Sequence, residues 1–298
     1  MPIAALPPGL LIRTAKTIWT TLWRTMMSQM APSDRGGAYQ RPKSLFCDRI
    51  PSPQFPASAE RYRLIVGMGC PWAHRTLIVR TLKGLGSTIP ITVVSPSGHE
   101  GCWVFDQPTQ SDSLGCRTVP QFYAQVQAGY QGRATVPILW DSQTNAIVNN
   151  ESSEIIEILN TGFNDWATHP APNLYPTKLK SEIDRWNTRI YATVNNGVYR
   201  CGFAQTQNAY EIACNELFDT LDHIDTTLAN QRYLCGDTPT LADVRLFTTL
   251  IRFDVAYHGL FKCNRRRIAD YKHLSGYVRD IYQLDGIAAT CDINAIKR

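Results

Sequence analysis

The feature that most constrains the fold is a cysteine that stands between a predicted strand and a predicted helix. Residues 61–66 form a short run typical of a strand, and Cys70 follows it with Pro71 directly behind. Proline is favoured in the first turn of a helix, where its missing N–H would be unbonded anyway. The helix predicted from there ends at Gly84. Its free N–H groups and dipole point at the sulfur and favour the thiolate, which is the nucleophilic form.

Residues 61–160 alternate between predicted strands and helices. Strands are expected at 62–66, 89–94, 135–140 and 146–148. Helices are expected to begin at Pro71 and near Ser152, and a hairpin turn at 141–145 joins the last two strands. This order is typical of a thioredoxin-like domain, in which a parallel β-α-β unit precedes a hairpin and a helix. The segment 95–132 is longer than a compact connection needs, which predicts a long irregular loop with a functional role.

Four segments are expected along the chain. They are an N-terminal arm at 1–60 with a helix near 12–30, a thioredoxin-like domain at 61–160, a linker at 161–175 and an all-helical domain at 176–298. In the last segment, apolar residues step by three and four, and Thr240 with Asp243 forms a capping-box-like helix start. The predicted fold class is therefore α/β plus all-α.

The composition excludes several classes of protein. The chain has 298 residues, is 44% hydrophobic and carries a formal net charge of +5, which are ordinary globular values. The densest basic cluster, at 265–267, has no nucleic-acid motif around it, so no nucleic-acid partner is expected. No apolar run reaches the roughly 18–20 residues that cross a bilayer, so no membrane partner is expected either. The nine cysteines include no C-x-x-C pair, which predicts free thiols in a reducing compartment and no metal site.

Residues 1–30 allow two interpretations. They contain no acidic residue and carry Arg13, Lys16 and Arg24 among apolar side chains. Such a composition fits an organelle transit peptide, in a plastid for example, or an arm of the mature protein that packs on its body. We favour the packed arm and, with it, a cytoplasmic location.

Cys70 is the candidate nucleophile. In its C-P-W-A motif, Ala73 occupies the position of a second cysteine, so no internal disulfide forms there. A lone thiolate attacks an external sulfur, and a second external thiol resolves the mixed disulfide. The alternative is a buried packing cysteine. The place between strand and helix favours catalysis, and the other eight cysteines are expected to be structural.

Two further motifs suit an extended peptide ligand. Pro137 opens a predicted strand, and a cis bond there would leave the Val136 backbone free to pair with the ligand; an ordinary trans proline is the alternative. Glu151 and Ser152 open the next helix. The helix N-terminus attracts a carboxylate and Glu151 attracts an ammonium, whereas the alternative is capping by Ser152 or Ser153.

Three more side chains have two interpretations each. Trp103, in the loop predicted at 95–132, is either a flat wall for a ligand or a core plug. Arg133 either pairs with a carboxylate or is a solvated charge. Two asparagines and a glycine interrupt a helical stretch before Tyr199, whose phenol either faces an aromatic substrate or belongs to the core.

Six motifs together resemble a known family. In order, they are Gly69-Cys70-Pro71-Trp72-Ala73-His74-Arg75, Gly101-Cys102-Trp103-Val104-Phe105, Gly132-Arg133-Ala134-Thr135-Val136-Pro137-Ile138-Leu139-Trp140-Asp141, Ile147-Val148-Asn149-Asn150-Glu151-Ser152, Asn195-Asn196-Gly197-Val198-Tyr199 and Phe261-Lys262-Cys263-Asn264. The set is similar to the xi class of glutathione transferases, the glutathionyl-hydroquinone reductases, over nearly all of residues 40–298. Residues 23–29 resemble cyanobacterial or plastid-lineage members.

The resemblance implies a glutathione-transferase helical domain and a glutathione-dependent reductive deglutathionylation of glutathionyl-hydroquinones. Cys70 would take the glutathionyl group, and a second glutathione would resolve the mixed disulfide. The residues that would hold glutathione, the co-substrate, are Trp103, Arg133, Val136, Pro137, Glu151 and Ser152. Tyr199 would face the glutathionylated hydroquinone. The resemblance also implies a homodimer built largely through the helical domain.

One departure and three rival functions accompany this resemblance. Family members generally continue past residue 298 with a segment whose tyrosine helps to line the hydroquinone pocket. A shortened or truncated chain is therefore expected to keep the glutathione half of the site and to lack part of the aromatic half. The rival functions are an omega-like thiol transferase or dehydroascorbate reductase, a non-catalytic interaction module of the same fold, and a classical transferase that activates glutathione with Tyr or Ser. The cysteine at the helix start disfavours the last of these.

Overall fold

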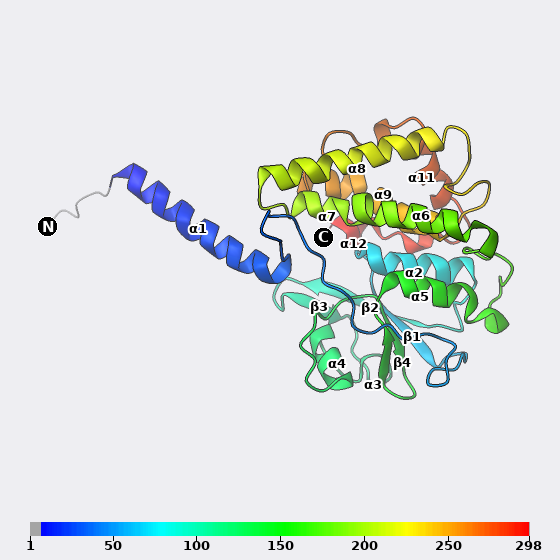
Figure 1. Ribbon diagram of the computed structural model, residues 1–298. Helices are drawn as coiled ribbons and strands as arrows, with labels where there is room; N and C mark the ends of the chain where they lie inside the picture. The colour runs from blue at the N-terminus through cyan, green and yellow to red at the C-terminus, as the bar shows by residue number, and fades with distance from the viewer. Residues whose placement is uncertain (1–6, 298) are drawn as a thin grey trace.

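The protein is described by a computed structural model, which covers residues 7–297. Its first part contains one long helix, a five-stranded sheet and the helices around that sheet (Figure 1). In chain order these are α1 (Pro8–Met30), β1 (Tyr62–Gly67), α2 (Pro71–Leu82), β2 (Ile91–Ser97), β3 (Cys102–Phe105), α3 (Gln110–Ser113), α4 (Val119–Val126), β4 (Ile138–Asp141), β5 (Ala146–Asn149) and α5 (Ser152–Thr161).

The sheet has the strand order β3-β2-β1-β4-β5. The central strand β1 runs parallel to β2 and antiparallel to β4, with Leu64 opposite both Ile91 and Leu139. Helices α2 and α5 cover one face of this sheet, and α3 and α4 lie on the other side (Figure 1). Because helices cover it on both sides, β1 is a continuous apolar run: Leu64, Ile65 and Val66 are fully buried.

The second part of the chain is helical. It contains α6 (Lys180–Ile190), a π-helical turn at Tyr191–Asn195, α7 (Gly197–Gly202), α8 (Gln207–Thr227), α9 (Leu241–Arg252), a π-helical turn at Phe253–Tyr257, α10 (His258–Leu260), α11 (Leu274–Tyr282) and α12 (Ile293–Lys297). Helix α9 packs against both α2 and α6. The layer formed by α2 and α5 therefore lies between the sheet and the helical part (Figure 1).

Most of the predicted elements agree with the structure. The strands predicted at 62–66 and 146–148 match β1 and β5 within one residue, and helices begin at Pro71 and Ser152. Thr240 caps α9 in a capping box with Asp243, as its sequence indicates. The strand predicted from residue 135 begins later, at Ile138, because Pro137 has no N–H to donate to a ladder.

The prediction of a long irregular loop at 95–132 was wrong. Strand β3 pairs antiparallel with β2, and Trp103 stands opposite Pro96 on this edge strand. Two short helices follow, and the second is capped by Thr118, whose side chain accepts from the Gln121 N–H while Gln121 bonds back. That T-x-x-Q signal with Pro120 in the first turn is visible in the sequence and was overlooked.

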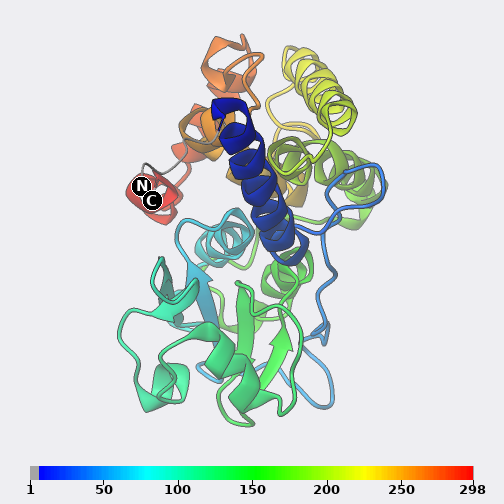
Figure 2. The same ribbon diagram turned by 90° about the vertical axis from the view of Figure 1, so that its left-hand side faces the viewer.

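The N-terminal arm divides into two parts. The extended residues 31–59 pack on the body, where Tyr39, Ile50 and Phe55 are buried. Cys47 forms an isolated antiparallel β-bridge with Asn149, the last residue of β5. Helix α1 instead projects away from the body in Figure 1, and in Figure 2, turned by 90°, it lies in front of the body and points toward the viewer. The prediction of a packed arm was therefore wrong for most of this helix, although Met27 near its end is buried.

Candidate functional site

The junction between β1 and α2 positions Cys70. The Cys70 N–H donates to the Gly67 carbonyl at 2.9 Å, and Cys70 is the N-cap residue of α2 with Pro71 next to it. The half-buried thiol donates to the carbonyl of Val136 at 3.6 Å. The Val136–Pro137 peptide is cis, so the trans alternative was wrong. Two motifs 66 residues apart in sequence thus meet at the sulfur.

An arginine from the helical part holds the residues before Cys70. Arg252, only 2% exposed, donates from Nε to the Gly69 carbonyl at 3.1 Å and from Nη2 to the Met68 carbonyl at 3.2 Å. Its Nη1 donates to the Thr248 carbonyl and to Nδ1 of His74, both at 2.9 Å. All four acceptors are uncharged, so a buried positive charge that pairs with no carboxylate among residues 7–297 lies beside the loop that precedes Cys70.

The bond from Arg252 fixes the state of His74. Since Nδ1 accepts from the guanidinium, the ring proton is on Nε2, which donates to Oγ1 of Thr290 at 2.8 Å. The Thr290 hydroxyl in turn donates to the Ile287 carbonyl at 2.7 Å. Burial, followed by the charge of Arg252, lowers the pKa of His74 well below its usual value. His74 is therefore a neutral link between α2 and the C-terminal segment.

This neutral histidine predicts a pH dependence of stability. In the unfolded chain His74 takes up a proton near pH 6.5, but in the folded chain it does not. Below that pH the unfolded state binds the extra proton, so the free energy of unfolding falls as the pH falls. The expected slope is about 1.4 kcal/mol per pH unit between about pH 6.5 and 5. Urea unfolding across this range measures it.

Two variants separate His74 from the other histidines. His74→Gln removes the titrating group, and we expect the slope to fall by most of that amount. His99→Gln is the control, because the His99 side chain is 92% exposed. His223, whose pKa burial also lowers, adds a smaller contribution of the same sign. An unchanged slope in His74→Gln would show that other groups carry the dependence.

A cavity of about 410 Å³ opens at the Val136–Pro137 segment; Cys70 does not line it but contacts the Val136 carbonyl. One wall is the extended arm at 41–45, another is 130–137 on the way into β4, and the floor is the start of α5 with Trp72 and Tyr191. Arg41, Lys43 and Arg133 bring positive charge to it, and Glu151 is its only carboxylate. The cavity suits a ligand that carries more than one carboxylate and an ammonium.

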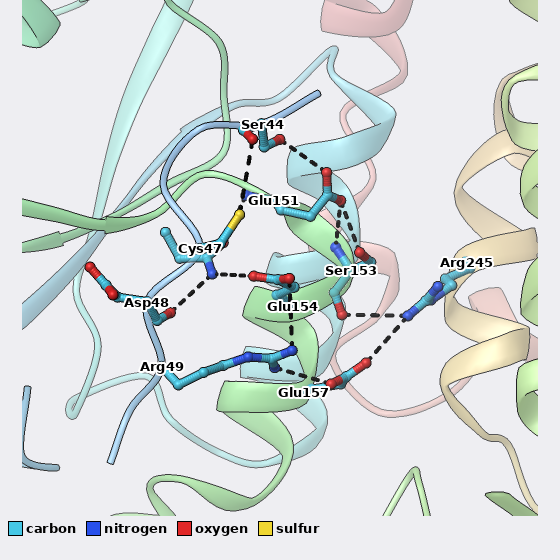
Figure 3. A network of polar contacts seen from close by, with 10 residues as sticks. Ser44, Cys47, Asp48, Arg49, Glu151, Ser153, Glu154, Glu157 and Arg245 are labelled. Carbon is cyan, nitrogen blue, oxygen red and sulfur yellow. Dashed lines mark hydrogen bonds and ion pairs between the residues drawn. The ribbon is translucent and has the colours of Figure 1, made fainter. Parts of the chain in front are cut away.

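Glu151 is the N-cap residue of α5, and its side chain is fixed by three donors (Figure 3). Its Oε1 accepts from the backbone and the hydroxyl of Ser153, both at 3.0 Å, and its Oε2 accepts from the Ser44 hydroxyl at 3.0 Å. Burial opposes ionisation, but these hydrogen bonds outweigh it and lower the pKa of Glu151. The predicted alternative of capping by Ser152 or Ser153 was wrong, because the carboxylate itself is the cap.

Arg75 connects this end of α5 to the helical part. It is 1% exposed and donates to the Ser152 hydroxyl at 3.3 Å and to Oδ1 of Asn195 at 2.6 Å. Its guanidinium lies 4.4 Å from the centre of the Trp72 ring, and Arg41 lies 4.0 Å from that centre. These two cation–π contacts help to order the wall of the cavity that carries Trp72.

Tyr199 lies on the aromatic side of the site. The helix is interrupted before it, as predicted, by the π-helical turn at 191–195. Its hydroxyl is 3.5 Å from that of Tyr257, and its ring stacks on Trp72 with centroids 6.2 Å apart. Burial raises the pKa of Tyr199, so the phenol stays protonated and able to donate. Tyr199 does not line the cavity itself; Trp72 lies between them.

Some of the predicted site residues line the cavity and others do not. Arg133, Val136, Pro137, Glu151 and Ser152 line the same cavity. Trp103 does not, and its ring instead covers Gly67 at the end of β1, where an added Cβ would be 2.5 Å from it. Within residues 7–297 no group of acidic, histidine and cysteine side chains is arranged for a metal ion.

Several site residues were not found from the sequence. Arg41 and Ser44 belong to the extended arm, and only the fold brings the arm to α5. Arg252 comes from α9 and reaches Gly69 across 183 positions. Trp72 differs from these residues because the sequence does contain a signal for it: it lies two residues after the candidate nucleophile Cys70.

Comparisons with known proteins agree with this arrangement. Residues 69–161 match the glutathione S-transferase N-terminal domain, and residues 207–280 match the C-terminal domain. The chain is 44% identical to the glutathionyl-hydroquinone reductase PcpF of Sphingobium chlorophenolicum, over 94% of this chain and 88% of the relative.

Two solved structures are similar throughout. The glutathione S-transferase Xi from Phanerochaete chrysosporium has a TM-score of 0.84 and 44% identity, covering 89% of this chain and 88% of its own. The glutathione-bound structure of YqjG, a glutathione transferase homolog from Escherichia coli K-12, has a TM-score of 0.78 and 43% identity, covering 87% and 83%.

Proposed function

This chain belongs to the xi class of the glutathione transferase family, and we propose that it is a glutathionyl-hydroquinone reductase with Cys70 as its nucleophile. The observation that carries the proposal is the lone cysteine at the N-terminus of α2, next to the cis Val136–Pro137 segment and a cavity that contains one ionised carboxylate. A thiol without an internal partner is suited to exchange with external sulfur.

The proposed reaction has two sulfur-transfer steps. In the first, the Cys70 thiolate attacks the glutathionyl sulfur, the bond between that sulfur and the hydroquinone ring breaks, and its electron pair goes to the ring carbon. The ring takes a proton and leaves as hydroquinone, while Cys70 carries a glutathione mixed disulfide. In the second, the thiolate of another glutathione attacks this disulfide and glutathione disulfide leaves. The hydroquinone carbon is reduced and the two glutathione sulfurs are oxidised.

The cavity fits glutathione as the co-substrate. Glu151 supplies a negative charge for the ammonium of the γ-glutamyl group, and the positive end of the α5 dipole suits its carboxylate. Arg41, Lys43 and Arg133 suit the glycyl carboxylate at the other end. Val136 would pair with the extended peptide through its backbone. Trp103 would act through the end of β1 instead of touching the ligand.

Tyr199 supports the aromatic half of the proposal. A neutral phenol beside Trp72 suits a hydrogen bond to a phenolic oxygen of the substrate as negative charge develops on the ring. The neighbouring Tyr257 hydroxyl holds this phenol in place.

The decisive experiment is a product analysis. Incubation with glutathionyl-menadiol and glutathione should release free menadiol and glutathione disulfide in equal amounts, measured by mass spectrometry. Turnover of dehydroascorbate alone would instead favour the omega-like alternative. No turnover of either, by a folded protein that binds glutathione, would favour the non-catalytic module.

Glu151→Gln tests the glutathione site. Loss of the charge partner for the ammonium should raise KM for glutathione by about tenfold or more, with a smaller change in kcat. Glu154→Gln is the matched control, because Glu154 is one turn further along α5 and pairs with Asn149 and Arg49 instead. Steady-state kinetics at varied glutathione measure both. Equal KM values in the two variants would remove Glu151 from the site.

The proposal extends to domains and assembly. The matched regions 69–161 and 207–280 support a glutathione-binding domain at 61–160, a linker at 161–175 and a helical domain at 176–298. The exposed Ile212, Val255 and Leu260 of the helical part support a homodimer through that domain. A cytoplasmic location completes the proposal.

A further inference from the structure

Helix α1 exposes an unusual amount of apolar surface. Ile12, Trp19 and Leu22 are 67%, 70% and 63% exposed, and Leu11, Ile18 and Met26 are each at least half exposed. The helix projects from the body (Figure 1), and the exposed fractions show that the rest of the described chain leaves these side chains largely uncovered. Soluble proteins rarely expose contiguous apolar patches of this kind unless the patch binds something.

The apolar side chains share one face of the helix. With 3.6 residues per turn, Ile12, Trp19 and Met26 fall in line, and Leu11, Ala15, Ile18 and Leu22 lie beside them. The opposite face carries Arg13 and the threonines 14, 17, 21 and 25. Thr17, Thr21 and Thr25 each donate to the carbonyl four residues earlier, at 2.9–3.0 Å. Apart from Leu10 near the start of the helix, this face is therefore polar, without acidic groups, and already hydrogen-bonded within the helix.

The charge of α1 indicates which kind of partner covers its apolar face. The helix contains no acidic residue, whereas Arg13 and Lys16 are exposed and pair with no carboxylate among residues 7–297. A second copy of α1 would bring the same positive charges together with nothing to neutralise them. An anionic phospholipid surface offers both an apolar layer and the opposite charge.

We propose that α1 lies in the headgroup region of an anionic membrane and holds the protein on that surface. Within residues 7–297 no helix is long and apolar enough to cross a bilayer. The expected mode is therefore binding in the plane of the interface, with Trp19 at headgroup depth. The prediction of no membrane partner considered only segments that cross the bilayer.

The C-terminal end of α1 connects this apolar surface to the candidate site. Met27 packs with Ala31 and Tyr39, and Trp23, Tyr199 and Phe203 pack against that cluster. A membrane under α1 would thus lie beside the aromatic side of the site. If the proposed function holds, apolar quinols released near Tyr199 would leave close to the bilayer, where they dissolve; this step rests on the proposed function, but membrane binding does not.

The test is vesicle flotation with the full chain. Vesicles of phosphatidylcholine with about one-third phosphatidylglycerol should carry the protein, and pure phosphatidylcholine vesicles should carry at least tenfold less at low salt. Ile12→Gln with Trp19→Gln should lower the partition coefficient at least tenfold. Thr14→Gln with Thr21→Gln, on the opposite face, should change it less than twofold. Activity on soluble glutathionyl-menadiol, measured without vesicles, should be the same in the native protein and both double variants.

Each result decides the proposal independently of the reductase assignment. Equal loss of flotation in both double variants, or equal binding to both kinds of vesicle, would overturn it. So would a helix-dependent dimer in sedimentation velocity that does not float, because a second copy would then cover the apolar face. Flotation as expected with no menadiol released would uphold membrane binding and reject the proposed function.

Discussion

Replacement of Cys70 by serine should abolish sulfur transfer, with kcat/KM for glutathionyl-menadiol lower by at least about a thousandfold. The hydroxyl is a far weaker nucleophile and cannot form a mixed disulfide. Intact-protein mass spectrometry after exposure to glutathione disulfide should show one glutathione adduct on the native protein that a reducing thiol removes, and none at residue 70 of the variant.

Cys102→Ser is the matched control for this experiment. Cys102 is also partly exposed, but it lies on the edge strand β3, which β2 separates from the central strand β1. Its variant should keep activity within about twofold. Comparable activity in Cys70→Ser and the native protein would remove the thiolate mechanism altogether.

Arg252→Leu should give the largest loss of stability. It removes the donor that satisfies four buried acceptors, on Gly69, Met68, Thr248 and His74. Each buried acceptor left without a partner costs about 1–3 kcal/mol, so the free energy of unfolding should fall by at least about 3 kcal/mol. Denaturant unfolding measures the change.

The exposed pair of Arg232 and Asp280 provides the comparison for Arg252. The Arg232 side chain is 59% exposed, so Arg232→Leu should lower the free energy of unfolding far less than Arg252→Leu. Arg252→Lys keeps the charge but cannot reach all four acceptors, so it should fall between the two. A loss in Arg252→Leu no larger than in Arg232→Leu would mean that the carbonyls before Cys70 are satisfied without the arginine.

Local signals explain what the sequence could predict. Cys70 and Pro71 mark a helix start, and Glu151 with Ser152 marks another, because helix termini need specific residues to satisfy their free backbone groups. The strands β1 and β5 were found because each has a buried apolar run bounded by polar or turn residues. The resemblance to the xi class added the ligand and the role of each motif.

The residues that were missed depend on contacts distant in sequence. Ser44 acquires a role only because the arm passes the N-terminus of α5, 107 residues later. Arg252 reads in the sequence as the basic end of an amphipathic helix, a position that usually faces solvent. Its burial follows from the packing of α9 on α2, which no local pattern encodes. Trp103 was placed in a loop because β3 is only four residues long.

The contact between the C-terminal segment and the nucleophile loop has a consequence for synthesis on the ribosome. The Thr290 hydroxyl is hydrogen-bonded to His74, which lies 216 positions earlier in the sequence. The Ala295 carbonyl oxygen approaches Gly69 so closely that a Cβ added there would be only 2.7 Å from it. While the chain is being translated, Cys70 emerges more than 200 residues before Thr290 and Ala295. The nascent protein therefore carries a thiol whose loop is not yet held, and the site is complete only after the segment with Thr290 and Ala295 has been translated and has folded back.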